Sequence, residues 1–310
     1  MKIKLVEMLQ YMRPEGSNTQ KNFCLEYLEP VFGKPDTYGN YIHHVGVKPR
    51  ICFTSHHDTV HKAEGMQKVV VNDNIITVAD PNVSSCLGAD CTTGIWLMLN
   101  MISEGVEGTY VVHAAEEIGC QGSKALVYDN PVWLDHTDAV ISFDRYGTKS
   151  VITHQMGMRT ASDAFAKSFS DALNMPQLVA DDGGSYTDSN EYANISVGYY
   201  SQHTTKETQS LVHAELLLTH LLQADWTKIV AERDPSVYES IYKPYSYKDY
   251  RYLESFDHDT SEDLVNLVLD YPDRVADMLA NYGFTAEEVM KECNISADYF
   301  TNDYIGSRYM

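Results

Sequence analysis

The sequence contains no apolar run close to the roughly 20 residues that a membrane-spanning helix needs. It is also poor in basic residues, with 23 Lys and Arg against 44 Asp and Glu and a formal net charge of −21. This balance argues against nucleic acid and against anionic membrane surfaces as partners. The amphipathic stretch MKIKLVEMLQYM contains Glu7 and lacks the apolar core of a signal peptide, so we expect a cytoplasmic protein.

Cysteine is sparse as well. Six cysteines occur in 310 residues, and none of them forms a C-x-x-C pair. A chain of this size does not need a disulfide scaffold, and free thiols are the expectation. Cys91 and Cys120 do lie beside acidic motifs. A zinc site with thiolate ligands therefore stays open, as the less favoured alternative to one built from nitrogen and oxygen ligands.

Strand-like and helical patterns alternate along the chain. Apolar, β-branched runs occur at 51–54, 108–112, 139–143 and 195–200. Helical patterns occur at 2–12, 21–28, 92–102, 121–129, 162–175 and 207–233, with Pro30 expected to stop the second of them. This alternation predicts an α/β fold with a mainly parallel, mixed central sheet and helices on both faces.

Two capping patterns mark helix starts near the acidic motifs. Thr92 and Thr93 can cap the helix that follows Asp90. Thr204 and Glu207 form a capping box, so the next helix is predicted to begin immediately after His203. Another helix start is predicted near Asp188, after a polar, glycine-bearing loop.

The composition changes near residue 236. Residues 1–235 carry all of the strand-ending motifs and form the predicted catalytic domain. Residues 236–310 begin with the tyrosine-rich stretch YESIYKPYSYKDYRYLESF and continue with two or three short helical patterns. We expect an extended segment and a small helical appendage there, with no function that the sequence assigns.

The predicted strands at 51–54 and 108–112 are each followed directly by polar side chains. His56 and Asp58 come after the run at 51–54, and Glu116 and Glu117 come after the run at 108–112. Residues two apart in an extended chain point to the same side, so Asp58 can orient the His56 ring. Two adjacent carboxylates stay ionised cheaply only near a cation or when one takes up a proton.

Three more such residues complete the pattern. Asp144 and His203 end two further strands, and Asp90 lies in a strand-to-helix loop. The carboxyl ends of parallel strands share one edge of a sheet, where open α/β folds place their ligands. We therefore expect all of these side chains to converge. Two histidines and three carboxylates form a fitting ligand set for two divalent ions, zinc especially.

The motifs resemble those of the co-catalytic dizinc exopeptidases of clan MH, the aminopeptidase family M-28 and its relative M-20. The matching stretches are SHHDTV, LGADCTTG, AAEEIG, ISFDRYG and SVGYYSQHT, within a region from about 38 to 222. The resemblance implies a sheet of the phosphorylase/zinc-exopeptidase type. It also implies five metal ligands: His56 and Asp144 for one ion, Glu117 and His203 for the other, and Asp90 bridging both.

The same resemblance implies the catalytic roles. Glu116 is expected to be the general base, and Asp58 is expected to orient His56. Relatives of the M-20 type insert a lid domain between the second aspartate and the last histidine. Asp144 and His203 are only 59 positions apart, so the architecture without a lid is favoured. Cys91 stands where many relatives carry a second aspartate.

The predicted function is metal-dependent hydrolysis of peptide bonds at a chain end. An aminopeptidase with two zinc ions is favoured, with cobalt or manganese as substitutes and a peptide or small amide as substrate. A related amidohydrolase, deacylase or dipeptidase on the same site stays open. A non-catalytic metal-binding homologue is disfavoured because Glu116 and every ligand are present. The sequence does not predict the oligomeric state.

Overall fold

The computed structural model describes residues 4–130, 133–134, 136–155, 158–182 and 191–234, together with positions 268, 275, 276 and 279. The predicted appendage at 236–310 lies outside the described residues apart from those four positions, and the predicted helix start near Asp188 lies outside them as well. The chain divides into two compact units, Met1–Tyr242 and Lys243–Met310. The elements given below belong to the first unit.

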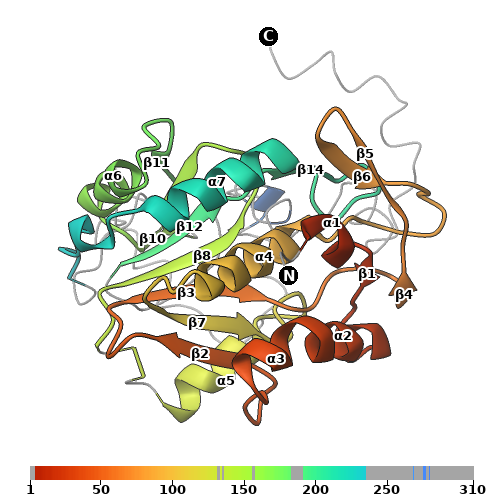
Figure 1. Cartoon of the computed structure of the whole chain (residues 1–310), viewed down its shortest axis with the longest axis horizontal. Coiled ribbons are helices and arrows are strands. Elements are labelled where there is room, and N and C mark those ends of the chain that lie inside the picture. The colour runs from red at the N-terminus through yellow and green to blue at the C-terminus, as the bar shows by residue number, and fades with distance from the viewer. Residues whose placement is uncertain are drawn as a thin grey trace. The chain divides into compact units, whose positions relative to one another are not determined.

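Eight strands form the central sheet in the order β10-β9-β12-β8-β3-β7-β2, with β11 paired to β9 (Figure 1). The four neighbours β12, β8, β3 and β7 run parallel. β2 is antiparallel to β7, and β9 is antiparallel to β12. The strands are β2 (Tyr41–Val45), β3 (Ile51–His56), β7 (Gly108–His113), β8 (Ala139–Arg145), β9 (Ser150–Gln155), β10 (Met158–Arg159), β11 (Val179–Asp182) and β12 (Tyr192–Ser196). The predicted mainly parallel, mixed sheet is confirmed.

The register brings the carboxyl ends of three parallel strands to one edge. His56 at the end of β3 pairs with His113 at the end of β7. On the other side of β3, Thr54 pairs with Ser142 of β8. The residues that follow these strands therefore leave the sheet side by side.

The two faces of the sheet carry separate apolar clusters. Helices α4 (Ala89–Ser103) and α7 (Leu211–Gln223) pack against each other, and α4 contacts β3 and β8 (Figure 1). Phe53 belongs to the main core with these helices, whereas its neighbour Cys52 belongs to a smaller cluster with Trp133 and Leu134. Successive side chains of a strand point to opposite faces, which explains the division. The predicted helices at 121–129 and 162–175 are confirmed as α5 (Gln121–Asp129) and α6 (Asp163–Ala172).

Two smaller sheets lie beside the central one. The order β13-β14-β6-β5 joins β5 (Val69–Asn72), β6 (Ile75–Val78), β13 (Tyr199–Tyr200) and β14 (Thr208–Ser210). Asp73 and Asn74 connect β5 to β6 with φ angles of 47° and 64°, the left-handed pair that a tight hairpin turn requires. The second sheet pairs β1 (Tyr11–Met12) with β4 (Gly65–Met66).

Two predictions near the N-terminus are wrong. The helix predicted over 2–12 is only α1 (Leu5–Met8), because Tyr11 and Met12 pair with β4 instead. The predicted stop at Pro30 does not occur. The chain continues from α2 (Asn18–Phe23) through one π-helical segment, η1 (Cys24–Leu28), into α3 (Glu29–Phe32). Pro30 lies in the first turn of α3, directly after the π-helical segment, a position at which a helix tolerates proline.

The capping box predicted after His203 is also wrong. Helix α7 begins at Leu211, and the Ser210 hydroxyl caps it by accepting the His213 N–H at 3.2 Å. The residues just before α7 form strand β14, which pairs with β6. The long helix predicted over 207–233 therefore ends as α7 at Gln223, followed by one 3₁₀ turn, η2 (Trp226–Lys228).

The start of α4 differs from its prediction too. The Thr92 hydroxyl donates to the Gly88 carbonyl, and the Thr93 hydroxyl donates to Gln209 Oε1 at 2.8 Å. Neither threonine therefore caps the helix. The Glu207 carboxylate instead accepts the N–H groups of Gly88, just before α4, and of Ala89, its first residue. In the described part of the chain, no helix is both long and apolar enough to cross a membrane.

Candidate metal centre

His56 is the last residue of β3 and is almost fully buried, with 3% of its surface exposed. Its Nδ1 atom lies 3.1 Å from the Asp58 carbonyl and 3.3 Å from Asp58 Oδ1. The opposite ring atom, Nε2, lies 3.8 Å from Glu116 Oε2 and 4.0 Å from Asp144 Oδ1. One side of the ring is thus held by Asp58 while the other faces two carboxylates, as a metal-ligating histidine requires.

Asp58 also fixes the pair of glutamates. Its two carboxylate oxygens accept the backbone N–H groups of Glu116 and Glu117, each at 3.0 Å. Ala115, just before them, has a φ of 52°, which turns the chain sharply at this point. A fully buried carboxylate that accepts two N–H groups can stay charged. Burial acts against ionisation, but the His56 ring and these N–H groups lower the pKa of Asp58.

The Asp90 side chain, in the first turn of α4, contacts the His203 ring. Asp90 Oδ2 lies 3.1 Å from His203 Nε2, and Asp90 Oδ1 accepts the Cys91 N–H at 2.6 Å. Glu117 Oε1 lies 3.4 Å from the same His203 nitrogen. Among the described residues, no donor forms a hydrogen bond with this buried glutamate oxygen, which leaves it open to a cation.

Asp144 lies near the end of β8, and two residues that the sequence did not single out hold its backbone. Its N–H donates to Asn194 Oδ1 at 3.0 Å, and its carbonyl accepts the Tyr199 hydroxyl at 2.9 Å. The carboxylate is left facing His56. Asn194 lies on the neighbouring strand β12, so only the strand order could have indicated this contact.

Two overlapping groups contain four of the five predicted ligands together with Glu116, whereas Asp144 is in neither and, in the described part of the chain, approaches the site only through His56, at 4.0 Å. Asp90, Glu117 and His203 each offer a ligand atom within 4.8 Å of the others. His56, Glu116 and Glu117 form a second such group, and His56 lies within the same limit of Asp90. Asp90 therefore has ligand atoms near both histidines, as a bridging carboxylate needs. The predicted site residues lie near the carboxyl ends of the central strands, but the prediction that His203 ends one of those strands is wrong, because it follows β13 of the smaller sheet.

The electrostatics of the site favour positive charge. Burial opposes protonation of His203, but Asp90 and Glu117 raise its pKa to about 11. Burial raises the pKa of Glu117 to about 6, and burial likewise raises the pKa of Asp144 well above its ordinary value. Carboxylates this crowded ionise together only when cations offset their repulsion. The donor set of imidazole nitrogens and carboxylate oxygens suits zinc and related divalent ions.

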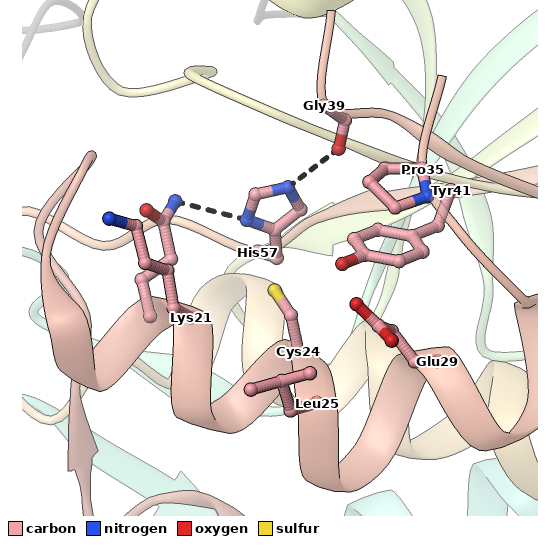
Figure 2. A pocket seen from close by; sticks show the side chains of 9 residues that line it. Lys21, Cys24, Leu25, Glu29, Pro35, Gly39, Tyr41 and His57 are labelled. Atoms are coloured by element: carbon pink, nitrogen blue, oxygen red, sulfur yellow. Dashed lines mark hydrogen bonds between the residues drawn. The ribbon is translucent and has the colours of Figure 1, made fainter. Parts of the chain in front are cut away.

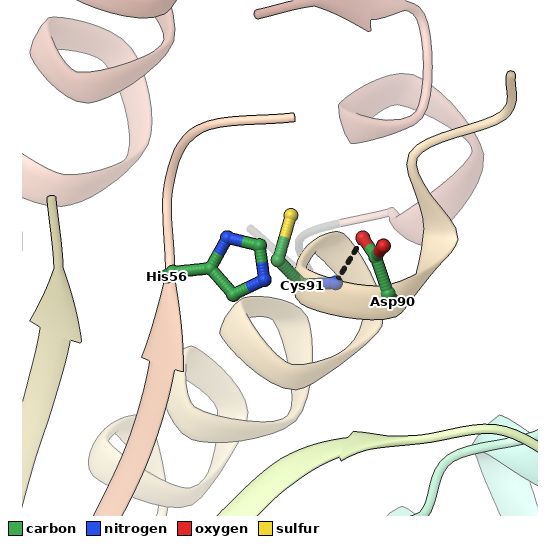
Figure 3. A group of neighbouring side chains, drawn as sticks. All are labelled: His56, Asp90 and Cys91. Carbon is green, nitrogen blue, oxygen red and sulfur yellow. Dashed lines mark hydrogen bonds between the residues drawn. The ribbon is translucent and has the colours of Figure 1, made fainter. Parts of the chain in front are cut away.

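Cys91 lies within the same 4.8 Å limit of His56 and Asp90 (Figure 3). Its S–H donates to the Asp58 carbonyl at 3.2 Å, and its sulfur accepts from Arg13 Nη2 at 3.2 Å. Burial raises the pKa of this thiol to about 11. These contacts favour a neutral thiol that packs behind the ligands.

Arg13 is a third residue that the sequence did not single out. It is fully buried, and its Nε atom donates to the His57 carbonyl at 3.0 Å. Its Nη2 atom also donates to the Thr92 hydroxyl at 2.8 Å. It thereby joins the end of β3 to the first turn of α4.

A pocket of about 350 Å³ lies next to His57, and none of the predicted ligands lines it (Figure 2). His57 Nδ1 lies 3.0 Å from Gln20 Nε2, and His57 Nε2 lies 3.1 Å from the Gly39 carbonyl. Cys24 and Tyr41 line the same pocket. The His57 ring is therefore held in the pocket wall, separate from the ligand cluster.

The sequence of this region matches the model of peptidase family M28 over residues 40–196, about half of the chain. The chain belongs to peptidase family M28. It is therefore a hydrolase and a peptidase. The matched residues include every predicted site residue except His203. No curated protein sequence matches the chain.

Solved structures of peptidases share the fold at low sequence identity. The TET1 peptidase of Pyrococcus horikoshii has a TM-score of 0.51 and 17% identity, over 72% of this chain and 100% of that one. A tripeptidase of Staphylococcus aureus has a TM-score of 0.55 and 14% identity, over 71% of this chain and 95% of that one. Aminopeptidase PepT of Bacillus cereus has a TM-score of 0.51 and 14% identity, over 71% and 96%.

Proposed function

We propose that this M28 peptidase is an aminopeptidase that uses two zinc ions. The observation that carries the proposal is the position of Asp90, which has ligand atoms within 4.8 Å of ligand atoms of both His56 and His203. His56 and Asp144 would hold one ion, Glu117 and His203 the other, with Asp90 shared. Bound in this way, the ions would polarise the scissile carbonyl, lower the pKa of a water and stabilise the oxyanion.

Glu116 is the proposed general base. It accepts a proton from the attacking water and returns it to the leaving amine. Its Oε2 atom lies 3.8 Å from His56 Nε2, while its backbone is held by Asp58. That hold fixes the backbone position from which the side chain extends toward the ligands. Asp58 has the supporting role of orienting both His56 and the Glu116 backbone.

Specificity for a chain end is the finer part of the proposal. The free α-amine of a peptide would be recognised by carboxylates that ligation leaves with spare acceptor capacity. Two of the similar structures are named an aminopeptidase and a tripeptidase, which supports an enzyme acting at chain ends. A deacylase or dipeptidase on the same site is the competing activity.

A matched substrate panel tests the proposal. The full chain is stripped with a chelator, reloaded with zinc, cobalt or manganese, and assayed on an aminoacyl anilide and on its N-acetylated form. A dipeptide and an N-acyl amino acid complete the panel. We expect cleavage of the free-amine anilide and no cleavage of the acetylated one. Cleavage of only the N-acyl compounds would make the protein a deacylase, and metal-loaded protein inactive on all four would contradict the proposed activity.

A further inference from the structure

Glu207 binds the start of α4 through its side chain. Its Oε2 atom accepts the N–H groups of Leu87 at 2.9 Å and Gly88 at 3.2 Å, and its Oε1 atom accepts that of Ala89 at 2.7 Å. Gly88 has a φ of 69°, the left-handed conformation that turns successive N–H groups toward one anion. Glu207 is almost fully buried, with 1% of its surface exposed.

These three hydrogen bonds offset part of the cost of burying this carboxyl group, although burial and the Asp90 carboxylate still raise the pKa of Glu207 to about 8. Taking a charged group out of water is costly unless hydrogen bonds replace its hydration. The N-terminus of a helix also carries a partial positive charge that favours an anion. Glu207 thus satisfies the N–H group of Ala89, the first residue of α4, and those of Leu87 and Gly88 just before it.

The same contacts connect two proposed metal ligands. Asp90 is the second residue of α4, and His203 lies four residues before Glu207. The segment that carries His203 is therefore attached to the helix that carries Asp90. Gln209 adds another attachment by accepting the Thr93 hydroxyl at 2.8 Å. His203 itself has a φ of 61°, a backbone conformation that needs such support in a residue other than glycine.

We propose that Glu207 is a positioning residue of the metal centre, holding Asp90 and His203 at the separation at which both can bind the same ion. This inference rests on the proposed two-metal function. Glu207 does not touch the ligand atoms in the described contacts, and its effect passes through the backbone on either side of them. Partners that hydrogen-bond metal ligands typically change metal affinity by about 10- to 100-fold when they are replaced, and we expect an effect of this order from Glu207.

Glu191 provides a matched control. It is also a fully buried carboxylate and accepts the N–H groups of Ser162 at 2.6 Å and Arg233 at 2.9 Å. It precedes β12, whose first residue pairs with Val140 near the start of β8, at the end of the sheet opposite Asp144. Glu191→Gln therefore removes a buried, hydrogen-bonded charge without touching the ligand segments.

The experiment compares zinc affinity in wild type, Glu207→Gln and Glu191→Gln by competition with a chromophoric chelator. In Glu207→Gln an amide NH₂ replaces one acceptor and faces an N–H donor. We expect zinc affinity to fall about 10- to 100-fold in this variant and to stay unchanged in Glu191→Gln. Thermal unfolding in EDTA should show a loss of stability in both. Equal zinc affinity in the two variants would overturn the positioning role.

Glu207→Asp serves if the glutamine variant does not fold. Aspartate keeps a carboxylate but draws it back by one methylene, so zinc affinity should fall below that of the wild type. Unchanged zinc affinity together with lower stability in EDTA would leave Glu207 a structural residue only and overturn the inference. Wild-type protein that binds no zinc would instead contradict the proposed two-metal function itself.

Discussion

Glu116 and Glu117 are adjacent in the sequence but lie beside different histidines. Glu116 Oε2 is 3.8 Å from His56 Nε2, whereas Glu117 Oε1 is 3.4 Å from His203 Nε2. Asp58 holds both backbone N–H groups, so the two side chains leave the turn from fixed positions. This separation allows one glutamate to bind an ion while the other handles a proton.

Replacing each glutamate by glutamine separates the two roles. Glu116→Gln keeps the shape and should keep both metals, but it removes proton transfer, which contributes about 10²- to 10⁴-fold in rate. Glu117→Gln should weaken the binding of one ion, because a neutral amide replaces a charged ligand. Activity and metal content are measured over a range of zinc concentrations. Recovery at high zinc is expected for Glu117→Gln only, and the reverse pattern would mean that the roles are exchanged.

Asp90→Ala tests whether one carboxylate serves both ions. Elemental analysis of zinc-incubated wild type should approach two ions per chain. Removal of a shared ligand should lower the occupancy of both sites, because each loses a charged oxygen. Asp138→Ala is the control, since Asp138 pairs with Arg50 and lies before β8, away from the ligands. A wild-type value of one or less, unchanged in Asp90→Ala, would contradict the paired site.

Gly94→Ala tests the close packing that places α4 on the sheet. A Cβ atom at Gly94 would lie 2.7 Å from Ser55 Oγ and would also meet the Phe143 carbonyl. Overpacking of this kind costs about 1–3 kcal/mol, which urea unfolding can measure. Ser103→Ala, at the exposed end of the same helix, should change the free energy of unfolding by less than about 0.5 kcal/mol. Equal effects of the two changes would show that α4 can move away from the sheet at little cost.

Protonation of His61 should destabilise the fold as the pH falls. Burial lowers the pKa of His61 to about 4, and its Nε2 atom lies 3.0 Å from the Cys86 carbonyl. Between about pH 6.5 and 4 the unfolded chain takes up a proton that the folded chain refuses, so stability is lost as the pH falls through this window. Above pH 6.5 this residue contributes nothing to the pH dependence.

The measurement is urea unfolding in EDTA at several pH values for wild type and His61→Gln. Glutamine can still donate to the Cys86 carbonyl but does not titrate. We expect the wild type to lose about 1.4 kcal/mol more per pH unit than the variant within the window. Parallel pH profiles for the two proteins would contradict a buried neutral His61.

The sequence alone was sufficient to predict the candidate site residues that come directly after strands. His56, Asp144 and the glutamate pair each come after an apolar run, and the shared edge of a parallel sheet brings such residues together. The helices at 121–129 and 162–175 were likewise predictable from their own periodicity. These features depend on local pattern and on one general rule of topology.

Glu207 shows why the rest was not predictable. Its spacing from Thr204 fits a local capping box, but its carboxylate binds N–H groups at Leu87–Ala89, roughly 120 positions away. Local pattern cannot decide between a near partner and a distant one, because both satisfy the same acceptor. The strand at Tyr11 was missed for the same reason, since its partner Met66 is remote in sequence.

The spread of the ligands along the chain has a consequence for folding kinetics. His56 and His203 are 147 positions apart, and the other proposed ligands lie between them. Contacts of such long sequence separation form late, because the closure of long loops must be completed first. A divalent ion would then bind only the assembled sheet, adding about 2.7 kcal/mol to the free energy of unfolding at one hundred times its Kd. The ion would slow the unfolding of the assembled sheet without setting the order in which its strands pair during folding.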